Sequence, residues 1–97
     1  NPYLAIAALL AGILMGIEHK LSAPTPISGN AWLEDDKTPP LPSHMGTAIS
    51  QFSASQAVRD YLSEPFQAAF TAVKTQELVE FETRVTDFEL ETYLASP

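Results

Sequence analysis

The chain has 97 residues, 45% hydrophobic and 18% charged, which is the composition of a globular protein and enough length for one small domain at most. Its formal charge is −7 and its five basic residues are scattered, so an interface with nucleic acid or with an anionic membrane surface is not expected. Because there is no cysteine, disulfides, thiolate metal sites and thiol nucleophiles are excluded.

The first 20 residues, NPYLAIAALLAGILMGIEHK, predict a helix that is apolar on every side. Asn1 suits the N-cap position, and Pro2 suits the first helical position, where its missing N–H does no harm. The uncharged run from Tyr3 to Ile17 has roughly 15 residues, whereas a membrane span needs about 20. A helix without a polar face belongs in the interior of a larger body, so we expect residues 1–20 to form a buried helix.

The remaining residues are too few to surround such a helix, and a start on Asn-Pro-Tyr rather than Met indicates a fragment of a longer protein. No basic segment precedes the apolar run, so a secretory signal is not predicted and we expect a cytoplasmic protein. A membrane-associated segment is the weaker alternative for this helix.

A proline-rich loop is predicted over residues 21–42, because five of the eight prolines lie there and exclude regular helix. Its centre, Glu34-Asp35-Asp36, lacks the spacing and the glycine of a calcium loop, so a solvated loop is a better interpretation than a cation site. Trp32, the single tryptophan, is expected to anchor this loop by packing on a neighbouring surface, with contact to a partner as the alternative.

Residues 43–97 predict a helical bundle, which opens with two short helices. Ser43 is expected to cap the first, and Ser53-x-x-Gln56 has the form of a capping box for the second. The apolar residues predicted to face inward are Met45, Ala48, Ile49 and Phe52 on the first helix and Val58, Tyr61 and Leu62 on the second.

A longer helix is predicted from 64 to 84, and Thr86-x-x-Glu89 forms a further capping box before a last helix. No segment alternates like a strand, so the predicted fold class of the fragment is all-α. The predicted inward residues are Phe66, Ala69, Phe70, Val73 and Phe81 on the long helix and Phe88, Leu90, Tyr93 and Leu94 on the last.

The residues alone indicate no active site. His19 and His44 are the only histidines, and neither belongs to an HExxH motif or a paired ligand pattern. No serine lies in a G-x-S-x-G elbow, and the four glycines form no phosphate-binding loop. The carboxylates that might pair for acid–base chemistry are read more simply as a solvated helix face: Glu80, Glu82, Glu89 and Glu91. We therefore predict no catalytic, cofactor-binding or metal-binding residue in this chain.

The order of its segments nevertheless resembles a known family. The opening NPYLAIAALLAGILMGIEHKL, the segment LPSHMGTAISQF, then EPFQAAFTAVKTQELVEF and the closing VTDFELETYL are similar, in this order, to the C-terminal helical region of glutamine synthetases and related γ-glutamyl-amine ligases. No single motif is diagnostic, but the resemblance covers essentially the whole chain.

The resemblance implies an α+β parent enzyme that uses ATP to phosphorylate the γ-carboxylate of glutamate and then lets ammonia or an amine displace the phosphate. In that family, Mg or Mn ions held by Glu and His side chains bridge substrate and nucleotide. Those ligands precede the Asn-Pro-Tyr turn, so none maps onto this sequence, and Asn1, Pro2 and Tyr3 correspond only to the structural turn. The implied partners are the remainder of the catalytic domain and further copies of the parent, in a homo-oligomer.

One departure from the family concerns Trp32, which aligns with a tyrosine that is adenylylated in a bacterial subgroup. Because Trp has no hydroxyl, that regulation is not expected here, and the loop and ending lean toward the γ-glutamylpolyamine synthetase branch. The competing hypothesis is a stand-alone acidic helical module that binds another protein.

Overall fold

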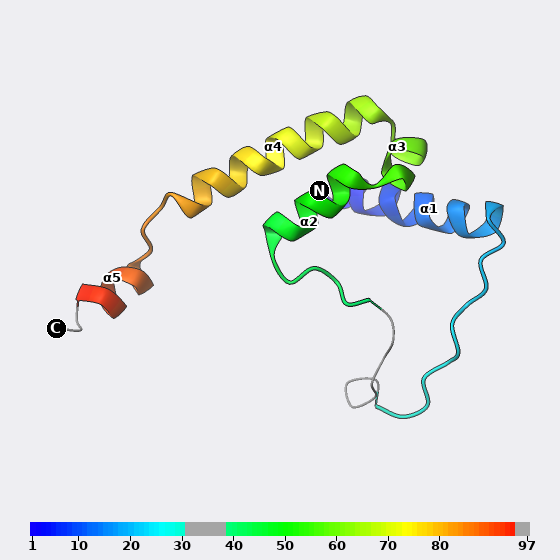
Figure 1. Cartoon of the computed structure of the whole chain (residues 1–97), viewed down its shortest axis with the longest axis horizontal. Coiled ribbons are helices and arrows are strands. Elements are labelled where there is room, and N and C mark those ends of the chain that lie inside the picture. Colours follow the sequence, from blue (N-terminus) through cyan, green and yellow to red (C-terminus); the bar gives the residue numbers. More distant parts are fainter. Residues whose placement is uncertain (31–38, 95–97) are drawn as a thin grey trace.

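The structure is a computed structural model that describes residues 1–30 and 39–94. Within these residues it consists of helices, with no strand, which confirms the all-α prediction. The helices are α1 (Pro2–Glu18), α2 (Met45–Ala54), α3 (Gln56–Leu62), α4 (Glu64–Glu82) and α5 (Asp87–Leu94), shown in chain order in Figure 1.

The start of α1 is as predicted. The Asn1 side-chain oxygen accepts hydrogen bonds from the backbone N–H groups of Tyr3 at 3.0 Å and Leu4 at 3.4 Å, and Pro2 occupies the first turn. Helix α1 ends in a Schellman-type turn, in which the N–H of Leu21 donates to the carbonyl of Gly16 at 3.0 Å. Lys20 takes the left-handed position of this turn with φ of 50°, where glycine is the usual residue.

Two predicted caps are wrong. Helix α2 begins at Met45 after an extended His44, so Ser43 lies one position too early to be its N-cap. The cap of α3 is Ser55, whose hydroxyl oxygen accepts from the N–H of Val58 at 3.2 Å. The Ser53 hydroxyl instead donates to the carbonyl of Ser50 inside α2, so the Ser53-x-x-Gln56 capping box does not form.

Helix α4 packs across α2 and α3, and its inward face agrees with the predicted one only in part. Phe66 and Phe70 are half-buried as expected, whereas Ala69 is exposed. Val73 and Phe81, which were expected to face inward, are 55% and 70% exposed. The side chain that is buried is Gln67, with 4% of its surface exposed. It donates two hydrogen bonds from Nε2, to the carbonyl oxygens of Phe52 at 2.7 Å and Ser55 at 2.9 Å.

Aromatic rings continue this contact between α2 and α4. Phe52 lies 5.0 Å from Phe70 and 6.4 Å from Phe66, measured between ring centroids, and the latter pair meets edge to face. Phe66 and Phe70 stack at 5.7 Å on the same side of α4. Such pairs add stabilisation beyond the area that they bury.

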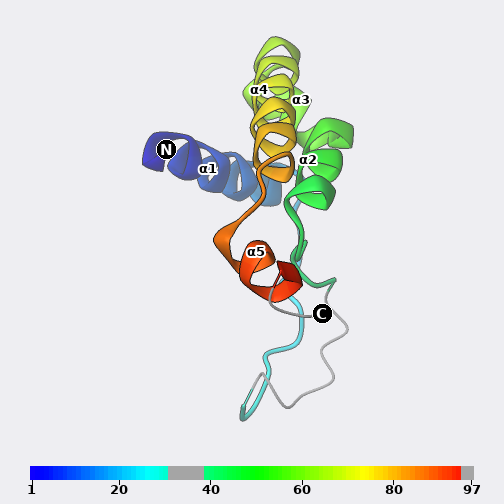
Figure 2. The same ribbon diagram turned by 90° about the vertical axis from the view of Figure 1, so that its left-hand side faces the viewer.

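The assembly is open rather than layered around a core. Helix α1 contacts α3 and crosses below α4, whereas α5 lies apart at the end of the chain (Figures 1 and 2). The chain measures 59 × 42 × 22 Å along its principal axes. No hydrophobic side chain in the described ranges is fully buried, so these helices do not enclose a core of their own.

We predict that Gln67→Met destabilises the protein by about 1–3 kcal/mol, because two hydrogen bonds to partly buried carbonyls are lost while the side-chain volume is kept. Urea unfolding followed by circular dichroism measures the change. Gln76→Met, on an exposed position of the same helix, is the matched control and is expected to change stability little. Equal effects of the two substitutions would contradict this role for Gln67.

Candidate functional surfaces

The two histidines lie at helix ends. His19 is the C-cap residue of α1, His44 immediately precedes α2, and both are exposed. Across residues 1–30 and 39–94, no three or more His, Asp or Glu side chains lie close enough together to hold a metal ion. These ranges therefore contain no grouping of ligands from which a metal centre could be built.

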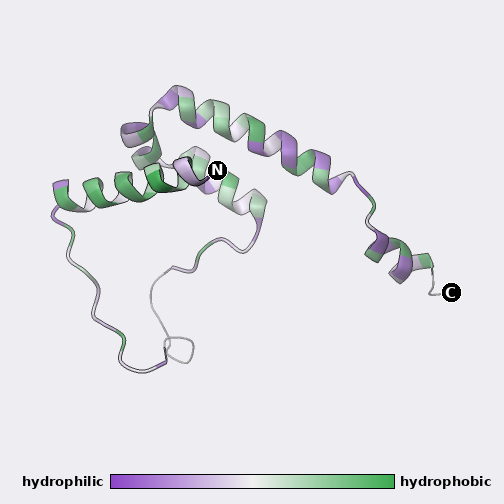
Figure 3. Cartoon of the chain, turned by 180° about the vertical axis from the view of Figure 1, so that it is seen from behind, coloured by the Kyte–Doolittle hydropathy of each residue, from purple (hydrophilic) through white to green (hydrophobic). Residues whose placement is uncertain are grey.

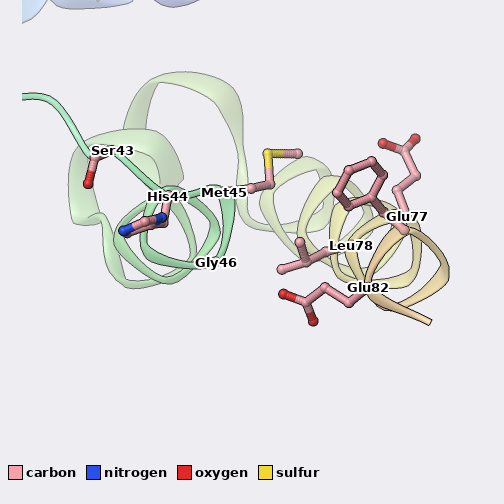
Figure 4. A pocket seen from close by; sticks show the side chains of 8 residues that line it. Ser43, His44, Met45, Gly46, Glu77, Leu78 and Glu82 are labelled. Carbon is pink, nitrogen blue, oxygen red and sulfur yellow. The ribbon is translucent and has the colours of Figure 1, made fainter. Parts of the chain in front are cut away.

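A cavity of about 490 Å³ opens between the start of α2 and the end of α4. Figure 4 shows His44 and Met45 on the α2 side and Glu77, Leu78 and Glu82 on the α4 side. The remaining lining residues are Ser43, Gly46 and Phe81. Apolar side chains therefore form its walls, with a histidine and two carboxylates among its lining.

This cavity lacks the coupling that nucleophilic catalysis needs. A nucleophile must lie within hydrogen-bond reach of its base, and in the described structure no hydrogen bond joins Ser43, His44 and Glu82. Glu77 is occupied by an ion pair with Lys74, whose Nζ lies 2.6 Å from its carboxylate. The cavity is thus an open groove between two helices rather than an assembled catalytic site.

The second surface is the long apolar exterior of α1, which Figure 3 colours hydrophobic along most of its length between two more polar ends. Large aliphatic side chains remain exposed along it, including Leu9 at 68%, Ile13 at 59% and Ile17 at 70%. Soluble proteins rarely expose a contiguous apolar patch of this kind unless it is an interaction site. Residues 21–30 and 39–94, the rest of what the structure describes, do not provide the buried environment predicted for residues 1–20.

A polar contact fixes the end of α1 to α3. The Tyr61 hydroxyl donates a hydrogen bond of 2.5 Å to the carboxylate of Glu18. This bond raises the pKa of Tyr61, because ionisation would remove the donor and place a second negative charge beside Glu18. Tyr61 therefore stays protonated at neutral pH and acts as a structural donor.

At the other end of the chain, α5 carries the predicted capping box. The Glu89 carboxylate accepts from the N–H of Thr86 at 2.7 Å and from its hydroxyl at 2.9 Å, while the N–H of Glu89 donates to the Thr86 hydroxyl oxygen at 3.3 Å. The hydrogen bonds from Thr86 favour the ionised form and lower the pKa of Glu89. This prediction is confirmed.

The residues singled out from the family resemblance fall in different places. Asn1 and Pro2 form the N-terminal turn of α1, and Tyr3 follows them with 81% of its surface exposed. Trp32 and the acidic run Glu34-Asp35-Asp36 lie outside the described residues. The role of Gln67 was not predicted. A single glutamine next to two alanines gives no indication in the sequence that its side-chain amide is buried and donates hydrogen bonds.

Comparison with known proteins adds an independent observation. The family model described as "Glutamine synthetase, catalytic domain" matches residues 1–93. The chain belongs to the glutamine synthetase family. No solved structure shows a significant match to it.

Several relatives of this glutamine synthetase family chain match almost all of it. The gamma-glutamylputrescine synthetase PuuA of Escherichia coli is 37% identical over 94 residues, covering 97% of this chain and 20% of that protein. A glutamate–isopropylamine ligase of a Pseudomonas species is 35% identical over 95 residues, with 97% and 21% covered. The glutamine synthetase of Methanocaldococcus jannaschii is 31% identical over 100 residues, with 97% and 22% covered. The chain therefore spans about one fifth of the length of these relatives.

Among the helices within residues 1–30 and 39–94, none combines the length and the apolar character that crossing a bilayer requires. Helix α1 carries no charged side chain before Glu18, but its 17 residues are fewer than a membrane span requires. The finding agrees with the length argument drawn from the sequence.

We predict that α5 loses helical structure as the pH falls from about 7 to about 3. The pKa of Glu89 is lowered in the folded helix, so its contribution is present above the ordinary Glu pKa and is lost as the pH falls through the lowered value. Carbon-13 Cα chemical shifts of residues 87–94 measure the loss.

Two variants control this experiment. Glu89→Gln removes the titrating cap and is expected to reduce the pH dependence, whereas Glu91→Gln, two residues further along the same helix, is expected to preserve it. An unchanged acid transition in Glu89→Gln would contradict the assignment to the capping box.

Proposed function

We propose that this chain is the C-terminal helical part, residues 1–97, of an ATP-dependent carbon–nitrogen ligase that joins glutamate to ammonia or an amine. The observation that carries the proposal is the match of residues 1–93 to the catalytic domain of the glutamine synthetase family. In this proposal residues 1–20 are the enclosed helix, residues 21–42 the connecting loop and residues 43–97 the helical bundle. A cytoplasmic location belongs to the proposal, because the reaction consumes ATP.

The role proposed for this part is scaffolding. The described residues do not fit a divalent ion, because they contain no group of three His, Asp or Glu side chains close enough to bind one. ATP and Mg or Mn are therefore assigned to the remainder of the parent enzyme, and no chemical step is assigned to this chain. Its helices would support the catalytic region from outside the reacting groups.

The acceptor that we propose is an amine larger than ammonia. The relatives named as a gamma-glutamylputrescine synthetase and a glutamate–isopropylamine ligase are 37% and 35% identical to this chain, whereas the glutamine synthetase of Methanocaldococcus jannaschii is 31% identical. These differences support the amine-ligase branch without identifying the amine.

Contacts between subunits are also part of the proposal. Helix α5 lies apart from α1–α4 in Figure 1, and its Phe88, Tyr93 and Leu94 are at least 75% exposed. Apolar side chains exposed on a separate helix favour burial against another surface. In a homo-oligomer of the parent, a second subunit would supply that surface.

We predict that the complete polypeptide containing this chain releases ADP from ATP in a glutamate-dependent reaction that also requires an amine. Putrescine, isopropylamine and ammonia are the three acceptors to compare, and mass spectrometry identifies the γ-glutamyl product. The 97-residue chain alone is expected to be inactive under the same conditions. Absence of a γ-glutamyl product with all three acceptors would contradict the proposed activity.

A further inference from the structure

The turn between α3 and α4 consists of a single residue, Ser63, which is both the C-cap of α3 and the N-cap of α4. Its backbone angles are φ 79° and ψ 148°, outside the regions that L-residues with a side chain normally occupy. The other non-glycine residue with positive φ in the described ranges, Lys20, has φ of 50° in an ordinary left-handed helix cap. Ser63 is therefore a strained point of the backbone, in a conformation that glycine adopts readily.

The Ser63 hydroxyl does not offset this strain, because it makes no capping hydrogen bond to α4. Backbone bonds hold the residue on both sides instead. Its N–H donates to the carbonyl of Arg59 at 3.1 Å, and its carbonyl accepts from the N–H of Gln67 at 3.1 Å. A strained conformation of this kind persists only where the surrounding structure over-determines it.

Gln67 contacts both ends of α3. Its N–H binds the carbonyl of Ser63 after the helix, and its side-chain amide donates to the carbonyl of Ser55 before the helix at 2.9 Å. The same amide donates to the carbonyl of Phe52 in α2, whose ring lies 6.4 Å from that of Phe66 on α4. From the Ser63 turn, α4 runs back across α2 (Figure 1). One side chain of α4 thus fixes the direction in which α4 leaves the seven-residue α3.

A second unfavourable feature lies one turn further along α4. The Thr71 hydroxyl oxygen is buried and has no hydrogen-bond partner among the described residues. It lies on the same face of α4 as Gln67, because the two residues are four positions apart. A buried hydroxyl without a partner costs free energy that contact with water restores. Separation of α4 from α2 therefore relieves both this hydroxyl and the Ser63 turn.

We infer that Ser63 is a strained hinge and that Gln67 holds it closed. Helix α4, with α5 at its end, turns away from α1–α3 when the Ser63 backbone relaxes to an ordinary conformation. The contact between α1 and α3 stays intact, because neither the Tyr61–Glu18 hydrogen bond nor Ala57 in the space between these helices involves α4. A hinge of this type absorbs a large change in φ and ψ at one position between two helices.

The test places a cysteine reporter on each side of the hinge in the complete polypeptide. Thr71→Cys puts a thiol at the buried hydroxyl position of α4, which opening exposes. Ala57→Cys puts one in the contact between α1 and α3, which opening leaves unchanged. Reaction with an uncharged maleimide is followed by mass spectrometry of the peptide that carries each cysteine. Each native rate is divided by the rate of the same variant in denaturant.

Three substitutions are combined with each reporter. Ser63→Gly removes the strain, Ser63→Ala removes only the hydroxyl, and Ser55→Gly introduces glycine at the other end of α3, where φ is an ordinary −71°. We expect Ser63→Gly to slow the Thr71→Cys reporter by about fivefold, because the strain exceeds the extra freedom that glycine gains in the open state. Ser63→Ala keeps the Cβ atom and is expected to stay within about twofold. Ser55→Gly is expected not to slow the reporter.

Gln67→Met tests the residue that holds the hinge closed. Loss of its two side-chain hydrogen bonds is expected to speed the reaction of the Thr71→Cys reporter by about tenfold and to leave the Ala57→Cys reporter unchanged. An unchanged rate at Thr71→Cys would overturn this role of Gln67.

Two further outcomes would overturn the hinge itself. The first is an equal rate at Thr71→Cys in Ser63→Gly and Ser63→Ala, since strain at Ser63 would then have no effect on opening. The second is equal slowing of both reporters by Ser63→Gly, since the whole fold rather than one junction would then be stabilised.

Discussion

The side-chain amide of Gln67 is the contact on which the arrangement of α2, α3 and α4 depends. It reaches from α4 to the carbonyl oxygens of Phe52, in the last turn of α2, and of Ser55, which is both the C-cap of α2 and the N-cap of α3. No hydrophobic side chain in the described ranges is fully buried, so apolar burial alone does not fix the register of α4 on the other two helices. A directional hydrogen-bonded pair does so, with the Phe52, Phe66 and Phe70 rings beside it.

The local features of this fold could be predicted, because their bonds span only two or three residues. The Asn1 cap and the Thr86–Glu89 capping box formed as expected. The choice between Ser53 and Ser55 could not be made locally. It depends on where α2 stops, and the amide of Gln67, 12 residues beyond Ser55, binds the carbonyls at that point.

The inward face of α4 also could not be predicted from local sequence alone, because it depends on contacts with other helices. The pattern of apolar residues placed Val73 and Phe81 on the inward face, yet both are exposed, while the polar Gln67 is buried. The hydrophobic pattern of a helix reports every apolar surface that it will eventually cover, not only the one formed within this chain. The family, in contrast, could be inferred from the order of the segments along the chain, and the family model matches residues 1–93.

In helix α1, side-chain polarity does not distinguish the side that meets α3 from the opposite side, whereas side-chain size does. Both of its faces are apolar, so hydropathy predicts only that the helix is enclosed. Side-chain volume separates the side that meets α3, where Ala8, Ala11 and Gly12 lie with Met15, from the exposed side that carries Leu9, Ile13 and Ile17. The uncharged run is too short for a bilayer and too apolar for water, so burial against a further apolar surface would stabilise it.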